Sequence, residues 1–439
     1  MQSTRKNQLV AFLSTSFLLF SMFFGAGNLI FPPMLGSGSG ENFSQAIIGF
    51  LLTGVALPVI AIIAVALTGR DIRDLGARGG VIFATGFACV VYLSIGAFYA
   101  LPRTGAVSFS TAVSPIFGVD STLASAIFNA IFFGGSVLLS LNPSSLVDRL
   151  GKILTPVLLI LLLLLIVVSV IKLPHVSSPA TDTYADSPLT MGLLEGYMTM
   201  DSLAALAYGI IIVSAFLNQG IPLGRSMVKR VGATGALAGG LLGVIYIGLG
   251  LIGHWLPGSQ DYSDGAALLT DASRITLGAS GQVIFGLIVL LACVTTAVGL
   301  LAATSEFFHR LVPAISYRNW LFGFGICSFL IASAGLNAVL SMAAPVIGAI
   351  YPIAITVIAI IIFETAVKTI PVLWGFRLSV WTATIISTIS AFAPAVLDWL
   401  PLAADGFGWL VPTLVAFIIG YTIDAFARRN ISIAESVAV

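Results

Sequence analysis

Long apolar runs, separated by short polar segments, repeat along the whole chain. A membrane-spanning helix needs about 20 predominantly apolar residues, and the runs predict twelve such helices. Their expected ranges are 8–36, 43–68, 80–101, 121–141, 151–172, 198–220, 231–256, 279–305, 319–335, 338–364, 378–397 and 408–427. The predicted fold class is therefore an all-α polytopic membrane protein, with residues 1–439 forming a single transmembrane domain.

The first run is interrupted in its middle by Gly25-Ala26-Gly27-Asn28 and is followed by Pro32-Pro33. Glycine weakens a helix interior by roughly 1 kcal/mol relative to Ala. Backbone groups freed inside a membrane must find partners in protein, water or a bound ion. The interruption therefore predicts either a packing site for a neighbouring helix or a binding site, and the coincidence of glycines, Asn and a Pro pair favours a binding site.

A second stretch of small residues lies in the sixth run, which begins five spans after the first. It is Ser202-Leu203-Ala204-Ala205-Leu206-Ala207-Tyr208-Gly209-Ile210. An odd-numbered unit places its second copy upside down, and matching interrupted helices mark the site of many secondary transporters. The pattern predicts a 5+5 inverted-repeat core with broken helices 1 and 6. Repeat one covers about 8–172, repeat two about 198–364, and two further helices about 378–427. For Gly209 alone, close helix packing is the alternative.

Charge sets the expected orientation. Only 8% of the residues are charged, against about 25% in soluble domains. With the N-terminus in the cytoplasm, 16 of the 19 Lys and Arg residues fall on the cytoplasmic side, and only Arg103, Lys172 and Arg274 fall outside. Cytoplasmic loops of membrane proteins carry an excess of these residues. We therefore expect a multi-pass protein of the cell membrane with both termini cytoplasmic.

Several functional classes lack support in the sequence. The net charge of +1 and the absence of a basic cluster give no reason to expect a nucleic-acid partner. No Walker-type loop is present, so no ATPase subunit and no organic cofactor are expected. The three cysteines lack metal-ligand spacing, and the few His, Cys and acidic residues form no recognisable catalytic set, so an enzyme is not expected.

The predicted spans are nearly free of ionisable residues, which bears on the coupling ion. The acidic candidates lie near predicted span ends: Asp201, Glu306, Glu364, Asp398 and Asp424. A proton-coupled carrier usually has a carboxylate or His deep in a span, so the pattern favours Na⁺ over H⁺. The pair Thr295-Thr296 of the eighth run can offer hydroxyl oxygens to an ion; the alternative is the usual bond of such hydroxyls to their own helix carbonyls.

A broken helix also suits a zwitterion. The half that begins near Gly27 or Asn28 points free N–H groups and a positive dipole end at the break, which favours a carboxylate. The half that ends at Phe24 leaves carbonyls that favour a cation or an ammonium group. Two antiparallel broken helices can therefore hold the head of an amino acid without a charged side chain.

These residues resemble the branched-chain amino acid:cation symporter family, the BrnQ-type carriers. The matching stretches are Met22 to Pro33 with Leu35-Gly36, Ala100-Leu101-Pro102-Arg103-Thr104 with Ser108-Phe109, Asn142-Pro143, Gly196 to Ala205, and Thr295 to Leu300. The first stretch is also similar to the first broken helix of leucine transporter-like folds. The resemblance implies uptake of leucine, isoleucine and valine coupled to Na⁺, and alternating access between the two sides.

The resemblance also implies a set of site residues. The Na⁺ ligands are the carbonyls of Ser21, Phe24 and Ala292 with the hydroxyls of Thr295 and Thr296. The substrate carboxylate meets Gly25, Ala26 and Gly27, and its ammonium meets the carbonyls from Ala204 to Ala207. Tyr92, Gly96, Tyr208 and Gly209 are expected around the pocket, and Asn28 matches an Asn that binds a second sodium in some members of the fold.

Two other functions stay open at the level of sequence. One is a sodium symporter for another small apolar amino acid or solute. The other is a channel or sensor that binds amino acids without coupled transport. No charged pore ring or filter-like repeat supports a channel.

Overall fold

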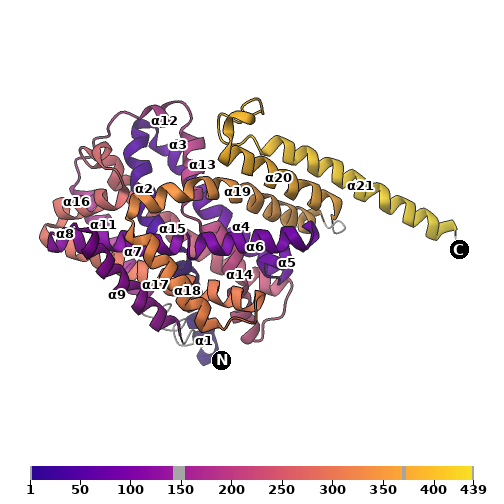
Figure 1. Cartoon of the computed structure of the whole chain (residues 1–439), viewed down its shortest axis with the longest axis horizontal. Helices are drawn as coiled ribbons and strands as arrows, with labels where there is room; N and C mark the ends of the chain where they lie inside the picture. The colour runs from indigo at the N-terminus through magenta and orange to yellow at the C-terminus, as the bar shows by residue number, and fades with distance from the viewer. Residues whose placement is uncertain (1, 142–153, 368–371, 438–439) are drawn as a thin grey trace.

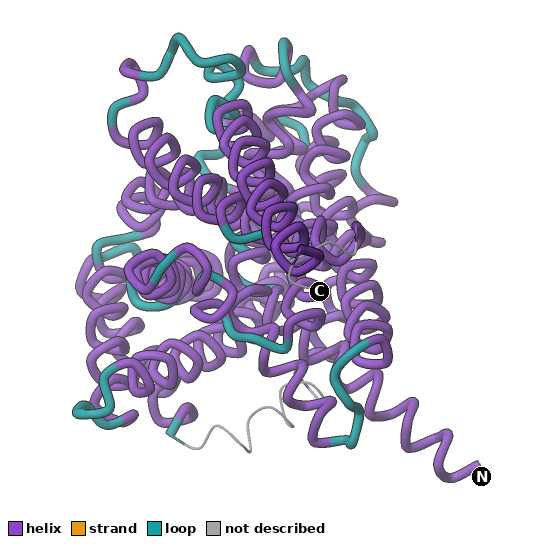
Figure 2. The backbone as a smooth tube through the Cα atoms, turned by 90° about the vertical axis from the view of Figure 1, so that its right-hand side faces the viewer, coloured by secondary structure: helices purple, strands orange, loops and turns teal. Residues whose placement is uncertain are grey.

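The computed structural model describes residues 2–141, 154–367 and 372–437, which form helices joined by loops and contain no strand (Figure 2). In chain order the elements are α1 (Gln2–Phe23), α2 (Ala26–Ser39), η1 (Gly40–Asn42), α3 (Phe43–Leu51), η2 (Leu52–Ala56), α4 (Leu57–Thr68), α5 (Ile72–Leu75), η3 (Ala77–Gly79), α6 (Val81–Ile95), α7 (Ala100–Ser108), η4 (Phe109–Val113), α8 (Ser114–Phe117), α9 (Thr122–Ser140), α11 (Thr155–Lys172), α12 (Asp182–Ala185), α13 (Pro188–Met198), α14 (Asp201–Asn218), α15 (Arg225–Trp255), η6 (Ser259–Asp261), α16 (Gly265–Leu277), α17 (Ala279–Leu311), α18 (Tyr317–Ser333), α19 (Leu336–Val367), α20 (Trp374–Phe392), η7 (Pro394–Val396) and α21 (Leu410–Val437).

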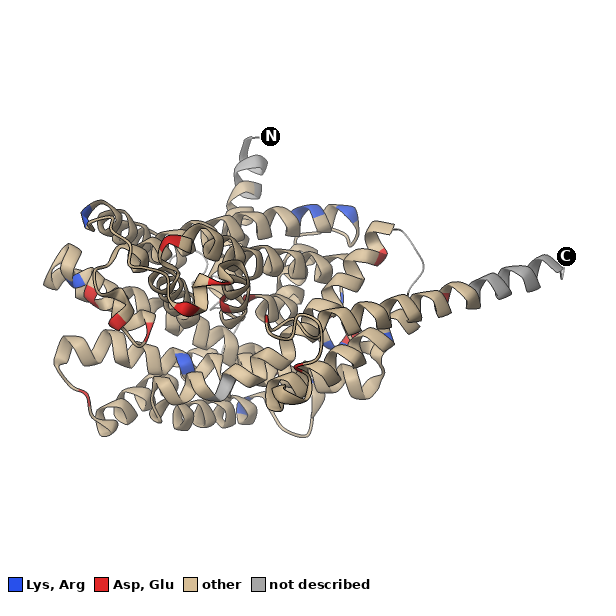
Figure 3. Cartoon of the chain, turned by 90° about the horizontal axis from the view of Figure 1, so that it is seen from above, with Lys and Arg blue, Asp and Glu red and all other residues tan. Residues whose placement is uncertain are grey.

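Each predicted apolar run coincides with one or more of these helices, which confirms the all-α class. Within the described ranges, nine helices are long and apolar enough to cross a membrane, and Leu9–Phe23 is a shorter apolar helix. The count of twelve spans stays a prediction. Figure 3 shows how sparsely charged residues are distributed over the helices, as a lipid-facing surface requires.

The third run differs from its predicted range of 80–101. α6 ends at Ile95, a turn follows over Gly96 to Tyr99, and α7, η4 and α8 then continue to Phe117. The charge distribution placed Arg103 outside the membrane, but Arg103 and Thr104 are both buried inside α7. The predicted outer position of Arg103 is therefore wrong, because a side chain that finds partners inside the protein does not need to leave the apolar core.

The two broken helices pack in a reciprocal manner. α1 and α2 lie along α15, whereas α13 and α14 lie along α3 and α4. Glycines bring the backbones together in both pairs. A Cβ on Gly36 would lie 1.9 Å from the carbonyl oxygen of Gly250, and a Cβ on Gly192 would lie 1.9 Å from that of Ala46. Small residues permit this close approach in membrane helices.

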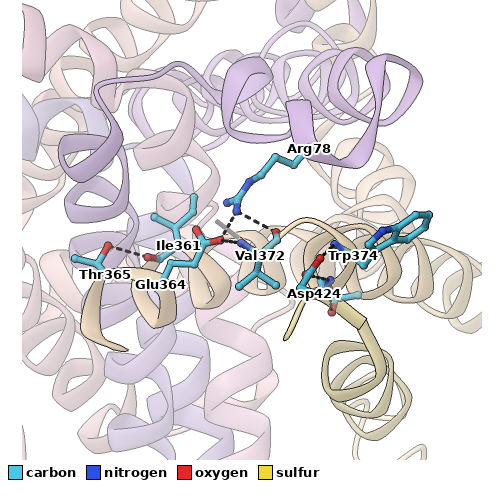
Figure 4. Close-up of polar contacts among 9 residues, drawn as sticks. Arg78, Ile361, Glu364, Thr365, Val372, Trp374 and Asp424 are labelled. Atoms are coloured by element: carbon cyan, nitrogen blue, oxygen red, sulfur yellow. Dashed lines mark hydrogen bonds and ion pairs between the residues drawn. The ribbon is translucent and has the colours of Figure 1, made fainter. Parts of the chain in front are cut away.

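The last two helices form a hairpin that extends away from the bundle, with α21 reaching furthest (Figure 1). Polar contacts fix the base of this hairpin (Figure 4). Arg78 Nη1 donates to the Glu364 carboxylate and, at 3.2 Å, to the carbonyl of Val372, whose N–H donates to Glu364 at 2.6 Å. The Asp424 carboxylate accepts the first two N–H groups of α20, each at 3.0 Å. The hairpin is thereby attached to the connection before α6.

Some features that the sequence singled out lie outside the described residues. These are the Asn142-Pro143 motif and the basic residues Arg149, Lys152 and Lys368.

Candidate functional site

The first helix break lies where the glycines predict it. α1 ends at Phe23, Gly25 has an extended backbone (φ −134°, ψ −162°), and α2 begins at Ala26. The Asn28 side chain bonds back across the break, because its Oδ1 accepts the N–H of Gly25 at 2.8 Å. The first N–H groups of α2 have no partner four residues earlier within that helix. They give the break a positive end.

The second break is not where the sequence placed it. α13 ends at Met198 and α14 begins at Asp201, with Met200 in the left-handed region (φ 67°) between them. The stretch from Ala204 to Gly209 lies inside the continuous α14. The prediction of a break there is wrong, because small residues in this stretch serve packing. A Cβ on Gly209 would lie 3.0 Å from the Val65 side chain, so this glycine lets α14 approach α4.

A buried polar network joins the two breaks. Asn28 Nδ2 lies 3.1 and 2.9 Å from the two carboxylate oxygens of Asp201. The Tyr246 hydroxyl of α15 donates to Asp201 Oδ2 at 2.6 Å and also contacts Asn28. Asp201 is 1% exposed. The expectation that acidic side chains stay at span margins is therefore wrong for Asp201, which opens α14 in the interior.

Asn28 thus has a defined role in this arrangement. Its amide oxygen is engaged by the backbone of the first break, and its amide nitrogen faces the carboxylate of the second. A match to a sodium-binding Asn remains a prediction from the resemblance. The bonds of Asn28 instead connect two helix ends that are separated by 173 residues.

Arg103 of α7 is the second buried charge near the breaks. Its Nη1 donates to the Tyr99 hydroxyl at 2.9 Å and to the carbonyl of Met198, the last residue of α13, at 3.1 Å. Its guanidinium also lies against the first turn of α2, since a Cβ on Gly27 would be 2.4 Å from Nη2. Arg103 therefore contacts elements from both breaks.

One residue of the threonine pair of α17, Thr296, contacts the first break. The Thr296 hydroxyl donates to the carbonyl of Phe24 at 3.0 Å, and the Thr295 hydroxyl donates to that of Ala292 at 2.8 Å. The Ser21 hydroxyl bonds to its own helix at Leu18. Gly25 makes the approach of Thr296 possible, because a Cβ there would lie 3.0 Å from the Thr296 side chain. The Thr296 hydroxyl and the Phe24 carbonyl thus meet across the two helices, whereas the Thr295 hydroxyl bonds to its own helix, which is the alternative that the sequence left open.

A cavity of about 440 Å³ lies next to this threonine pair. It is lined mainly by residues of α1, α6, α14 and α17, and it reaches the surface near Glu306 and Arg310, whose side chains are 47% and 71% exposed. Of the predicted site residues, the cavity is lined by Ser21, Tyr92, Ala207, Tyr208, Thr295 and Thr296.

Two of the polar residues in the cavity wall are Tyr92 and Tyr208. Tyr92 donates its hydroxyl to the carbonyl of Ala207 at 2.9 Å and stacks on Phe307. The buried hydroxyl of Tyr208 has no hydrogen-bond partner among the described residues. Buried hydroxyls are normally paired, so Tyr208 keeps a donor and an acceptor for a bound solute.

The remaining predicted residues do not line the cavity. Gly25, Ala26, Gly27 and Asn28 are buried in the break, and Phe24 and Ala292 lie behind the threonines. Ala204 and Ala205 are buried within α14. Gly96 serves a close contact with α17, because a Cβ there would lie 2.6 Å from the Thr304 hydroxyl.

Sequence reasoning missed three residues of the central network as site residues: Arg103, Asp201 and Tyr246. An acidic residue is favourable in the first turn of a helix, so Asp201 could have been recognised as the start of α14. Arg103 follows Pro102, a residue suited to the first turn of a helix. Nothing in the sequence around Tyr246 distinguishes it from a core tyrosine.

Comparison with known proteins gives consistent results. A family profile described as "Branched-chain amino acid transport protein" matches residues 8–427. The chain is 48% identical to the branched-chain amino acid permease BrnQ of Corynebacterium glutamicum, over 97% of this chain and 99% of that protein. It is 36% identical to the branched-chain amino acid permease BraB of Bacillus subtilis, over 93% and 94% of the two chains.

Solved structures share the fold at low sequence identity. Mhp1, a nucleobase-cation-symport-1 family transporter in a closed conformation with bromovinylhydantoin bound, matches with a TM-score of 0.62 at 13% identity, over 95% of this chain and 93% of that chain. MhsT in complex with L-phenylalanine matches with a TM-score of 0.58 at 16% identity, over 87% and 98%. These likenesses support the leucine transporter-like architecture.

Proposed function

The chain belongs to the family of branched-chain amino acid transport proteins, and from this premise we propose that it imports leucine, isoleucine and valine together with Na⁺ by alternating access. The coarser statement, a multi-pass membrane protein that transports branched-chain amino acids, follows from the family. The observation that carries the finer proposal is the contact of the Thr296 hydroxyl with the Phe24 carbonyl at the first helix break.

The Na⁺ site is proposed between α1 and α17. Its ligands are the carbonyls of Ser21, Phe24 and Ala292 and the hydroxyls of Thr295 and Thr296. Two hydroxyl–carbonyl pairs of this set already lie at 2.8 and 3.0 Å. A Na⁺ ion between them would accept lone pairs from all these neutral oxygens, and the carbonyls at the C-terminal end of α1 add the negative end of the helix dipole.

The substrate site is proposed between the break and the cavity. The N–H groups of Ala26 and Gly27 suit the carboxylate, whereas that of Gly25 already donates to Asn28. Tyr92, Ala207 and Tyr208 line the space for the rest of the molecule. Apolar pockets separate side chains by only about 1–3 kcal/mol per methylene. One pocket should therefore accept leucine, isoleucine and valine with modest differences and reject polar side chains, which lose their water partners.

Alternating access is proposed from the repeat architecture. The reciprocal packing of α1 and α2 on α15 and of α13 and α14 on α3 and α4 supports a 5+5 inverted repeat with two further helices. With both termini cytoplasmic, as the loop charges predict, the cavity mouth at Glu306 and Arg310 faces the cytoplasm. The described conformation is then the inward-facing one, which releases the substrate into the cytoplasm.

Proton coupling is a second candidate, and Asp201 favours it. The sequence argument against H⁺ relied on the absence of a deep carboxylate, and Asp201 is such a group. Ionisable residues inside membranes often mark proton or ion pathways. However, donors from Asn28 and Tyr246 hold this carboxylate, and such donors stabilise an acceptor-only, ionised group. We therefore keep Na⁺ as the proposed coupling ion.

Uptake of labelled isoleucine into proteoliposomes tests the proposal. The matched conditions are an inward Na⁺ gradient, an inward H⁺ gradient and no gradient. We expect accumulation only with Na⁺ and competition by leucine and valine. Equal uptake in all three conditions would indicate a channel. Accumulation with the H⁺ gradient alone would indicate proton coupling through Asp201. Stronger competition by another small apolar solute would identify that solute as the preferred substrate.

A further inference from the structure

Arg103 carries a positive charge in the interior and forms no ion pair with the described residues. Its side chain is buried, with the residue only 3% exposed. Among the described residues, ion pairs involve Arg78, Arg274 and Arg310, and none involves Arg103. Arginine is almost never fully buried unless it is paired, because an isolated charge loses its hydration without compensation.

The contacts that Arg103 does make are neutral. Nη1 donates to a hydroxyl and a carbonyl, and the guanidinium lies 4.6 Å from the ring centre of Tyr99 and 5.6 Å from that of Phe31. Within the part of the chain that the structure describes, Nε has no hydrogen-bond partner. Asp201 acts on Arg103 only through space, since its oxygens are taken by Asn28 and Tyr246. The guanidinium therefore retains donors for an anion.

The position of these donors identifies the anion. A Cβ on Gly27 would lie 2.4 Å from Nη2 and 2.6 Å from the central guanidinium carbon, so Arg103 covers the first turn of α2. The N–H groups and the dipole of this 14-residue helix point positive charge at the same place. A helix N-terminus and a buried arginine with unused donors converge on one small region, and both favour a carboxylate.

We propose that Arg103 binds the carboxylate of the transported amino acid together with the first N–H groups of α2. This inference rests on the proposed function, because it assigns a residue to the substrate site proposed there. The amino acid then supplies the missing negative charge each time it binds. An uncharged solute of the same shape leaves Arg103 without a counter-ion and binds weakly.

The alternative is a purely structural arginine that caps α13 through the carbonyl of Met198. Such a residue stabilises the fold equally for every ligand. The two roles differ in one measurable property, which is the discrimination between a carboxylate and its neutral amide. Leucine and leucinamide differ at this group and share the side chain and the amine.

Binding of leucine and leucinamide to the purified full-length protein in saturating Na⁺ tests the proposal. The pH is chosen below the amine pKa, so that both amines are protonated. In the wild type, we expect leucinamide to bind at least about tenfold more weakly than leucine, as loss of a hydrogen bond to a charged group implies. Equal affinities in the wild type would overturn the proposal without requiring any variant.

Variants then assign the discrimination to Arg103. We expect Arg103→Gln to weaken leucine binding roughly 10- to 100-fold and to leave leucinamide binding unchanged, with Arg103→Lys restoring part of the preference. The control Arg274→Gln changes a surface arginine whose side chain is 60% exposed and should alter neither ligand.

The remaining outcomes are also decisive. Equal weakening of both ligands by Arg103→Gln would indicate the structural role and overturn the proposal. If Arg103→Gln does not fold, the wild-type comparison and Arg103→Lys decide. If the wild type binds leucinamide and leucine equally, the proposed role of Arg103 is refuted and the proposed function is not. If the wild type binds no branched-chain amino acid, the proposed function and this inference are both refuted.

Discussion

At the residue scale, Gly25 determines how closely α17 approaches the first break. A methyl group at this position would lie 3.0 Å from both the Thr296 hydroxyl and its methyl carbon. Gly25→Ala should therefore displace Thr296 from the Phe24 carbonyl and raise the Na⁺ concentration for half-maximal uptake several-fold. The control is Gly134→Ala, because a Cβ at Gly134 meets nothing within 4 Å. An unchanged Na⁺ requirement in a well-expressed Gly25→Ala protein would remove Thr296 from the ion site.

The charge of Asp201 gives a second prediction at this scale. Asp201→Asn keeps the shape of the side chain and removes a charged acceptor, which costs roughly 1.5–3 kcal/mol of stability. Because Na⁺ is the proposed coupling ion, uptake by this variant should stay Na⁺-dependent, while its thermal unfolding temperature falls. Loss of gradient-driven accumulation, with exchange of substrate retained, would instead show that protonation of Asp201 drives transport.

Individual buried charges could not be predicted from hydropathy. A hydropathy window averages over about 19 residues, so Arg103 was assigned to an outer loop and Asp201 to a span margin. Their burial depends on partners that the chain brings from far away. Asp201 is held by Asn28 and Tyr246, which lie 173 and 45 residues from it.

At the element scale, glycines fix the packing of each broken helix on its neighbour. Adding a methyl group at Gly36 or Gly192 would place it 1.9 Å from a backbone oxygen of the facing helix. Overpacking of this kind costs about 1–3 kcal/mol, so Gly36→Ala and Gly192→Ala should each lower the unfolding temperature of the purified protein. Gly240→Ala on α15 meets nothing within 4 Å and is the control.

If neither substitution lowers the unfolding temperature relative to Gly240→Ala, the close contacts of α2 with α15 and of α13 with α3 do not exist in the protein. Similar losses at both positions would support the reciprocal arrangement that an inverted repeat requires.

The first break could be predicted from sequence, whereas the others could not. Gly25, Gly27 and Asn28 combine weak helix propensity with a side chain that caps the new helix. The second break depends on Met200, a residue that rarely adopts a positive φ, and tertiary contacts hold it there. The interruption over Gly96 to Tyr99 in the third run also lacked a proline signal.

At the scale of the whole molecule, composition was sufficient for the class of protein. Apolar runs and the scarcity of charge predicted a helical membrane protein, and the helical fold confirms the all-α architecture. The contact of Thr296 with the Phe24 carbonyl is consistent with the ion site that the family resemblance implies, and the site itself stays a prediction. The number of spans and the orientation of the termini stay predictions, because they depend on the membrane as well as on the chain.

The central claim is that Na⁺ and a branched-chain amino acid bind to one connected site at the first break. Linkage requires that each ligand strengthens binding of the other by the same factor. The most direct measurement is the dissociation constant of isoleucine for the purified protein across a Na⁺ titration. It is compared with that of the double variant Thr295→Ala/Thr296→Ala and the control Thr356→Ala, whose hydroxyl bonds within α19. The account predicts that Na⁺ tightens isoleucine binding at least about fivefold in the wild type and the control, and that the double variant loses this effect. An isoleucine affinity independent of Na⁺ in the wild type would contradict it.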